Sequence, residues 1–162
     1  MHEAVKEWVR VNLPREFDSV VEVGSRDING SLRSLFVGKE YVGVDILPGE
    51  NVDLVADAAQ PLPLPNNKFD VAVCVAVFEH TPDTAAIIKS MTEVMRPGGK
   101  MLLMAAYQWP AHSAIDGGWA LHPGEYYANI PESDLNSALA DAGLSDWKVV
   151  VQGMDIYAVA IK

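Results

Sequence analysis

The chain has 162 residues, 49% of them hydrophobic, which suits a single domain over residues 1–162 with a core of its own. Its 12 Lys and Arg are outnumbered by 22 Asp and Glu, and the net charge of −10 argues against direct binding to nucleic acid, where affinity comes largely from neutralising phosphates. A single cysteine, Cys74, excludes an internal disulfide, and the lack of any long apolar run predicts a cytoplasmic protein that does not enter membranes.

The first predicted elements are a helix and a short strand. Apolar residues recur at helical spacing over residues 5–13 and stop at Pro14, which predicts an amphipathic helix that covers the sheet or borders a pocket. Valines within residues 20–23 predict a buried strand that ends at Gly24. After a polar loop, the apolar residues within 32–36 predict a second helix.

The loop from Gly24 to Gly30 is acidic and lacks the dinucleotide fingerprint GxGxxG. A pyrophosphate needs bare backbone amides with no carboxylate beside them, whereas Glu22 and Asp27 flank this turn. The loop therefore favours a cationic or zwitterionic ligand over a polyphosphate. S-adenosylmethionine (SAM) meets that description, because its ammonium and sulfonium groups are positive and it carries no phosphate.

Acids close the next two strands. Residues 41–44 predict the second strand, and Asp45 ends it about 20 residues after the first turn, where nucleotide-binding α/β folds place a ribose-binding carboxylate. Residues 53–56 predict a short third strand that ends at Asp57. Three prolines within residues 61–65 then predict an extended connection.

The middle of the chain predicts a central strand and a helix. Residues 69–77 form the longest apolar run, which suits a parallel strand buried on both faces and makes Cys74 a core thiol. Thr81, Pro82 and Asp83 fit the N-cap, first position and acidic first turn of a helix that stops at the Arg-Pro-Gly-Gly sequence over residues 96–99.

The last predicted elements complete the fold. Residues 100–106 predict a fifth strand, and a helix is expected to follow Pro131 and end at Gly143. Residues 147–151 and 156–161 are joined by a tight connection and predict an antiparallel hairpin. The predicted fold is α/β: a Rossmann-like, doubly wound, mixed sheet of seven strands, mostly parallel with a C-terminal antiparallel hairpin strand, and with helices on both faces.

The segment 107–130 has no helix or strand periodicity, yet it is rich in aromatic residues. An irregular insert of this length in a compact domain is usually functional or disordered, and the aromatic content argues against disorder. We predict a lid over a substrate site, hinged at Gly117 and Gly118, with an aromatic dimerisation surface as the alternative, so that the chain is a monomer or a homodimer. The predicted substrate contacts are Tyr107, Trp109, Asp116, Trp119, His122 and Tyr126.

Five segments, in order, resemble the motifs of class I SAM-dependent methyltransferases, and most closely the small type 11 group. They lie within residues 19–106 and read VVEVGSRDING, YVGVDILPG, VDLVADA, FDVAVCVAVFEHTPD and MRPGGKMLLMA. In the first motif, Gly-Ser-Arg-Asp-Ile-Asn-Gly stands where the family usually has a glycine-rich GxGxG. The resemblance implies methyl transfer from SAM to a small or planar acceptor, with S-adenosylhomocysteine as the product.

The resemblance also implies which residues bind the cofactor. Glu22, Gly24 and Ser25 would lie beside the methionine portion of SAM, and the Val75 carbonyl would lie at its ammonium. The full set of implied cofactor residues is Glu22, Gly24, Ser25, Asp45, Ile46, Asp57, Ala58 and Val75.

On the nucleoside side, the resemblance implies that Asp45 accepts hydrogen bonds from both ribose hydroxyls, which suits a carboxylate with two acceptor oxygens. Ile46 would lie against the adenine, Asp57 would accept from its amine, and the Ala58 amide would donate to a ring nitrogen. Structural alternatives remain, because Asp57 also fits a turn cap and Ile46 a core position.

Methyl transfer from a sulfonium depends mainly on alignment and desolvation, so a base is needed only for a weakly acidic acceptor. The predicted catalytic residues are Glu79 and His80, after the fourth strand, and His112, after the fifth. His112 with Asp116 and His122 has the side-chain types of a metal site, but no further ligand spacing supports one, and we predict no metal.

Two other functions fit parts of the pattern. A catalytically inactive SAM- or nucleoside-binding module acting as a partner subunit would tolerate the altered first motif. A nicotinamide oxidoreductase would fit the early strands but not Asp27 or the terminal hairpin.

Overall fold

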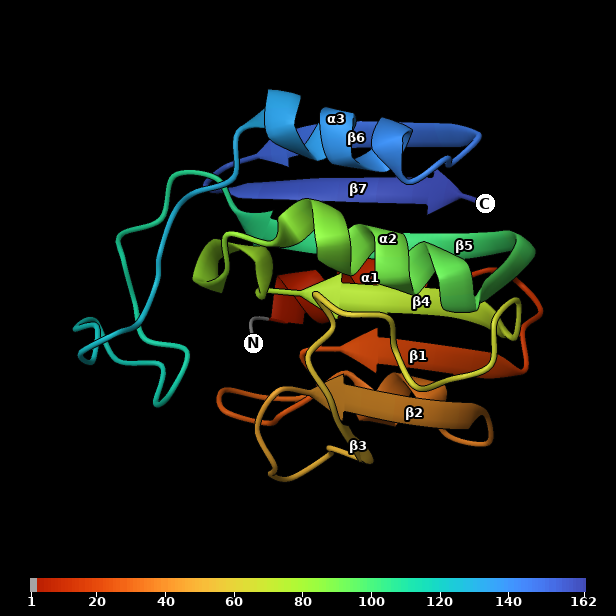
Figure 1. The fold of residues 1–162 in the computed structure, drawn as a ribbon, viewed down its shortest axis with the longest axis horizontal. Helices are drawn as coiled ribbons and strands as arrows, with labels where there is room; N and C mark the ends of the chain where they lie inside the picture. The colour runs from red at the N-terminus through yellow and green to blue at the C-terminus, as the bar shows by residue number, and fades with distance from the viewer. Residues whose placement is uncertain (1–2) are drawn as a thin grey trace.

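The computed structural model describes residues 3–162 as one mixed sheet with helices on both faces (Figure 1). Within these residues the strands are β1 Ser19–Val23, β2 Glu40–Asp45, β3 Leu54–Val55, β4 Phe69–Val75, β5 Met95–Ala106, β6 Asp146–Gln152 and β7 Asp155–Ile161. Their order across the sheet is β3-β2-β1-β4-β5-β7-β6. The first five strands are parallel, while β7 is antiparallel to both β5 and β6, which confirms the predicted sheet and its closing hairpin.

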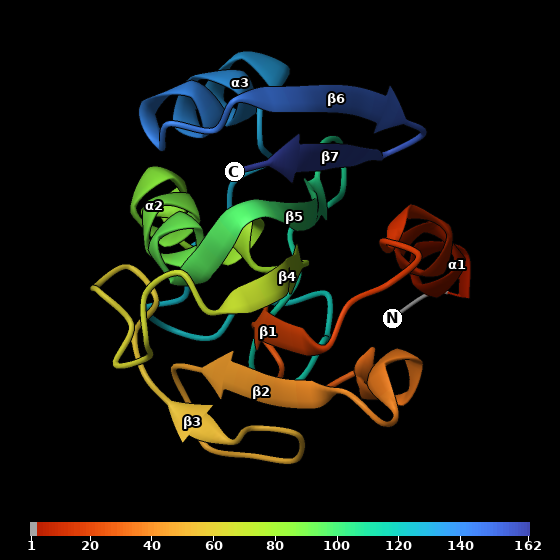
Figure 2. The same cartoon turned by 90° about the vertical axis from the view of Figure 1, so that its right-hand side faces the viewer.

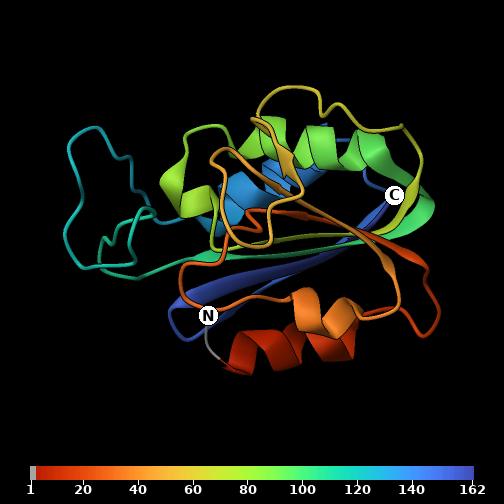
Figure 3. The ribbon, with the colours of Figure 1, turned by 90° about the horizontal axis from the view of Figure 1, so that it is seen from below.

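The helices lie on both faces, as the sequence predicts (Figures 2 and 3). They are α1 Glu3–Asn12, the 3-10 turns η1 Arg33–Phe36 and η2 Phe78–His80, α2 Thr84–Val94 and α3 Glu132–Asp141. One buried cluster packs Ile88 of α2 and Leu139 of α3 against the sheet, and a second packs Val9 of α1 and Phe36 of η1 against the opposite face. Cys74 of β4 is fully buried in the first of these clusters, as predicted.

Several predicted boundaries are wrong. The helix expected over residues 32–36 is only the short turn η1, because Val37 leaves the helical region with ψ of 129° and Gly38 follows in the left-handed conformation. The Thr81 hydroxyl accepts a hydrogen bond from the Asp83 amide at 3.1 Å, and this local turn delays the start of α2 to Thr84, with Asp83 at the N-cap position. The fifth strand already begins at Met95 instead of residue 100, with a register shift opposite Phe69 and Val71.

The carboxyl ends of the parallel strands share one edge of the sheet, and the segment 107–130 projects beyond that edge (Figure 1). The strand β4 ends at Val75, because Ala76 takes a left-handed conformation with φ of 54°. That bend turns the chain into η2 and directs it along the edge. Among the residues that the structure describes, no helix is long and apolar enough to cross a membrane.

Candidate functional site

A cavity of about 700 Å³ lies at the carboxyl edge of the sheet, where open α/β folds bind their ligands. The structure brings to it all eight residues predicted to bind the cofactor, Glu22, Gly24, Ser25, Asp45, Ile46, Asp57, Ala58 and Val75. The three predicted catalytic residues, Glu79, His80 and His112, line the same cavity.

Glu22 lies on β1 with 2% of its surface exposed. Burial raises the pKa of Glu22 to about 7, although a hydrogen bond from Tyr41 and the nearby charge of Arg33 oppose the rise. The Tyr41 hydroxyl donates to Glu22 Oε2 at 2.6 Å, which occupies one carboxylate oxygen. A cationic group beside the other oxygen would stabilise the ionised carboxylate.

The turn after β1 is built on Gly24, whose φ is 82°. A Cβ at this position would lie 2.1 Å from Val77 Cγ2, so the loop and the end of β4 approach each other too closely for any side chain. Next to it, Ser25 Oγ is buried, and the residues that the structure describes offer it no hydrogen-bond partner. Because buried hydroxyls are rarely left unpaired, this atom fits a ligand polar group.

Asp45 ends β2 with its carboxylate held in a fixed orientation. Its two oxygens accept the Leu47 amide at 3.0 Å and the Arg26 amide at 3.3 Å, and Arg26 Nε lies 3.9 Å away. Each carboxylate oxygen keeps a second lone pair for a ligand hydroxyl. Ile46 is 64% exposed, so it is an apolar wall of the cavity and not a core residue.

Asp57 follows β3 and accepts the Ala59 amide at 2.9 Å, which is the turn-capping role anticipated as its structural alternative. The same side chain also lines the cavity, beside Ala58. The Ala58 carbonyl is held by the Ser90 hydroxyl at 2.6 Å, which fixes this turn against α2.

The segment 107–130 is seated on the loop that follows β1. Arg26 Nη2 donates to the Ala114 carbonyl at 2.9 Å, and Gly117 lies so close to Asn29 that a Cβ would stand 2.1 Å from its Nδ2. Arg26 and Asn29 are the residues by which the first motif departs from its usual glycine pattern. The contacts of these two residues with the 107–130 segment were not predicted. The only feature of the sequence that pointed to them was the unusual first motif.

Glu125 organises the segment 107–130 from within. Its carboxylate accepts the Ser113 hydroxyl at 2.9 Å, the Ala114 amide at 2.8 Å and the His122 amide at 2.6 Å. An irregular segment held by three such bonds is an ordered loop. The role of Glu125 was not predicted, because an isolated acid carries no periodic signal in the sequence.

Glu79, His80 and His112 converge at the outer end of the cavity. The rings of His80 and His112 meet edge to face with centroids 5.0 Å apart, and Tyr127 packs against both. Burial raises the pKa of Glu79 to about 7, and burial together with the nearby His112 lowers the pKa of His80 to about 4. One potential ligand atom of each of Glu79, His80 and His112 lies within 4.8 Å of the others.

Two of the six predicted acceptor contacts, Trp109 and Trp119, line the cavity. Their rings stack at 6.4 Å with 20° between the planes, and Trp109 Nε1 donates to Asp155 Oδ1 at 2.6 Å. The other four predicted contacts are not among the described residues that line the cavity. They are Tyr107, Asp116, His122 and Tyr126. Asp116 and His122 instead form an exposed pair at 2.9 Å.

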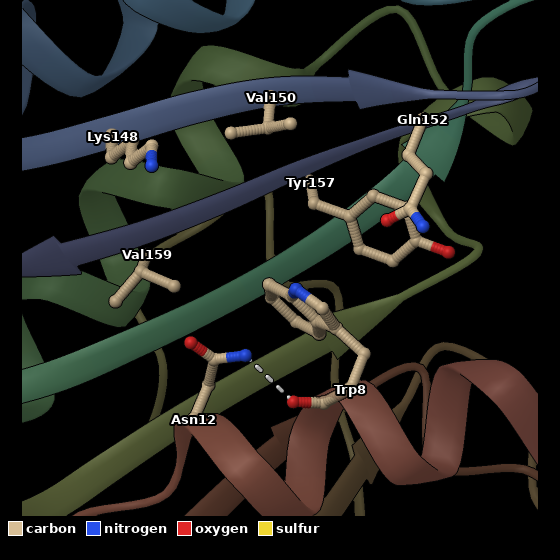
Figure 4. Close-up of a pocket in the computed structure, with 7 residues that line it drawn as sticks. All are labelled: Trp8, Asn12, Lys148, Val150, Gln152, Tyr157 and Val159. Atoms are coloured by element: carbon tan, nitrogen blue, oxygen red, sulfur yellow. Dashed lines mark hydrogen bonds between the residues drawn. The ribbon is translucent and has the colours of Figure 1, made fainter.

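A second, smaller hollow of about 160 Å³ lies between α1 and the hairpin of β6 and β7 (Figure 4). Trp8 packs on Tyr157 there with ring centroids 4.8 Å apart, and Asn12 Nδ2 donates to the Trp8 carbonyl at 2.8 Å. Lys148 is the one charged side chain of its lining. The larger cavity, with its converging carboxylates and imidazoles, is therefore the candidate active site.

Comparison with known proteins agrees with this assignment. Residues 1–149 match the model of a family described as methyltransferase domain. Among curated proteins, the ubiquinone/menaquinone biosynthesis C-methyltransferase UbiE of Shewanella woodyi is 33% identical over 108 residues, which are 64% of this chain and 41% of that enzyme. The chain thus spans about two fifths of the length of that relative.

Solved structures agree on the fold. A SAM-dependent methyltransferase from Thermotoga maritima, described as a possible histamine N-methyltransferase, superposes with a TM-score of 0.70 at 17% identity, covering 97% of this chain and 87% of that one. A SAM-dependent methyltransferase from Mesorhizobium loti gives 0.70 at 15% identity, covering 97% and 98%. At such identities these likenesses establish the architecture and leave the acceptor open.

Proposed function

The chain belongs to the family of SAM-dependent methyltransferase domains, and from that premise we propose that it methylates a small, planar acceptor held in the cavity beneath the 107–130 loop. The observation that carries the proposal is the shared cavity, which joins the predicted cofactor residues at the strand ends to the aromatic loop. A cofactor and an acceptor held in one enclosed space can be aligned for direct transfer.

The residues at the strand ends fit SAM. The Glu22 carboxylate would pair with the methionine ammonium, the orphaned Ser25 hydroxyl would bond to the same portion, and Asp45 would hold the ribose hydroxyls. The exposed face of Ile46 suits an adenine ring. When bound, SAM supplies an electrophilic methyl group on a sulfonium, and the protein's own task is to orient the two reactants and exclude water.

SAM binding should depend on the ionisation of Glu22. Because this carboxyl has a pKa of about 7 in the folded chain, it is largely protonated at lower pH and must lose its proton to pair with an ammonium. We expect the dissociation constant for SAM to rise by up to about tenfold per unit as pH falls below roughly 7. Calorimetry in buffers of different ionisation enthalpy should also detect proton release on binding.

Glu22→Gln is the control for that dependence, because it keeps the shape and the Tyr41 contact but cannot ionise. It should bind SAM more weakly at high pH and show a flattened pH profile. A profile as steep as that of the unaltered chain would assign the dependence to another group, such as Glu79.

On the acceptor side, the lining favours an aromatic ring. Trp109 and Trp119 offer stacked indole faces, and His80 and His112 meet edge to face, with Tyr127 packed against both from outside the lining. The similarity to a C-methyltransferase of quinone biosynthesis supports the same choice. We infer that the acceptor is a hydroxylated aromatic ring, with Glu79, His80 and His112 placed to orient its oxygen.

Isotope-labelled SAM tests this proposal directly. Incubated with hydroquinones, catechols and phenols, and in parallel with aliphatic alcohols and amines, the protein should label the hydroxylated aromatics. Transfer to the aliphatic acceptors alone would contradict the acceptor class. A blank with every acceptor, despite tight SAM binding, would favour a binding-only partner subunit.

Trp119 provides a sharper test of the acceptor side. It lines the cavity and stacks on Trp109, yet it is 70% exposed, so Trp119→Ala should not affect folding. We expect the KM for the acceptor to rise by about 2- to 10-fold, the equivalent of one lost aromatic contact, with SAM affinity unchanged. Leu121→Ala is the matched control, because Leu121 is exposed on the same loop and does not line the cavity. Equal effects of the two substitutions would contradict the stacking role.

A further inference from the structure

We propose that Glu79, His80 and His112 form a binding site for a divalent transition-metal ion of the zinc class at the acceptor end of the cavity. The role given to the bound ion, holding the acceptor oxygen, rests on the proposed function. The binding of the ion does not, because it follows from the three side chains themselves.

The three side chains have the composition of a catalytic metal centre. Two imidazoles and one carboxylate are the ligand set of many zinc sites that keep a position open for a water or substrate, and of mononuclear iron sites. Within the described residues this is the one group of three such side chains whose ligand atoms lie within 4.8 Å of one another. Ligand atoms around tetrahedral zinc lie roughly 3.3 Å apart, so these atoms would have to approach one another by at most about 1.5 Å to hold an ion.

Two atoms of the candidate ligands form no hydrogen bond within the described part of the chain. Glu79 Oε2 and His80 Nδ1 are both buried and lack a hydrogen-bond partner there. Glu79 as a residue is only 1% exposed. Leaving such atoms unpaired costs free energy, which is why native proteins pair nearly all of them, and a cation bound by both residues would remove the deficit.

The third ligand, His112, has one ring nitrogen engaged by the backbone. His112 Nδ1 lies 3.1 Å from the Pro110 carbonyl oxygen, which can only accept a hydrogen bond. Nδ1 therefore carries the proton, and Nε2 keeps its lone pair. A backbone carbonyl that fixes the tautomer through the second ring nitrogen is a typical outer partner of metal-bound histidine.

The position of the site gives the ion a function. His80 and Glu79 follow β4, where they are held by the sheet, whereas His112 comes from the 107–130 loop. An ion bound by all three would tie the loop to the sheet and present its open coordination position to the cavity. A phenolic oxygen bound there would be fixed in orientation relative to the cofactor side.

Metal binding by the full chain tests the inference. Competition of the protein with a chromophoric chelator for Zn²⁺ should reveal one site, and Co²⁺ in its place should give the visible absorption of a low-symmetry complex. His112→Ala and Glu79→Gln should each weaken Zn²⁺ binding by at least about tenfold and abolish the Co²⁺ spectrum. His122→Ala is the matched control, since the imidazole of this exposed histidine of the same loop is paired with Asp116.

The outcomes separate this inference from the proposed function. A chain that binds SAM but neither ion contradicts the metal site and leaves methyl transfer intact. Loss of Zn²⁺ in His122→Ala, with retention in His112→Ala, also overturns the assignment. SAM calorimetry on each variant shows whether the variant is folded. His112 is a partly exposed loop residue, so the His112→Ala variant keeps the test valid even if Glu79→Gln does not fold.

Discussion

Asp45→Ala is expected to weaken SAM binding by about 1–3 kcal/mol, or roughly 5- to 150-fold in dissociation constant, while the fold is retained. The carboxylate is held in place by the Leu47 and Arg26 amides and would accept both ribose hydroxyls. Removing it deletes two charge-assisted acceptors at once and leaves Arg26 Nε without its nearest carboxylate. Calorimetric titration with SAM measures the effect.

Two controls sharpen the Asp45 experiment. Asp45→Asn keeps the shape and one good acceptor, so it should fall between the alanine variant and the unaltered chain. Glu50→Ala makes the same change in net charge at an exposed acid that does not line the cavity. An Asp45→Ala variant that binds SAM normally, or a Glu50→Ala variant that loses as much, would refute the role of Asp45.

Gly24→Ala should be strongly destabilising, lowering the free energy of unfolding by about 2–5 kcal/mol. The new Cβ would face two penalties. It would be held at φ of 82°, which side chains rarely adopt, and it would stand 2.1 Å from Val77 Cγ2. Urea unfolding measures the loss, and SAM affinity should fall with it because the same turn borders the cavity.

The chain offers a matched glycine for this experiment. Gly38 has a φ of 80° but no atom within 4 Å of an added Cβ, so Gly38→Ala should pay the backbone strain alone, about 1–2 kcal/mol. The difference between the two variants isolates the overlap with Val77, and Val77→Ala in the Gly24→Ala background should recover part of it. Equal losses at Gly24 and Gly38 would contradict the close packing of this turn.

The fold was predictable because its signals are local and periodic. The valine-rich segments of β1 and β4 predicted buried strands. The acids Asp45 and Asp57 indicated where β2 and β3 end. Since parallel strands end at one edge, the cofactor residues had to lie together. The start of α2 was mispredicted because the Thr81 hydroxyl serves a turn within its own segment instead of the helix.

The acceptor side was harder to predict, because its contacts join segments far apart in the chain. The Arg26 side chain donates a hydrogen bond to the Ala114 carbonyl, and the two residues are 88 positions apart in the sequence. Nothing in the sequence near either residue predicts this contact. The three-residue cluster of Glu79, His80 and His112 likewise unites two strand ends through an irregular loop. Residue types alone pointed to His112, Asp116 and His122 as a group, but the structure separates His112 from the other two.

A crystal structure of the chain with S-adenosylhomocysteine tests the central claim most directly. We expect the ribose on Asp45, the amino group beside Glu22, and the sulfur facing the open space between Trp109 and the group formed by Glu79, His80 and His112. A cofactor bound elsewhere, or one whose sulfur points away from the 107–130 loop, would contradict this account of how the protein holds its two reactants.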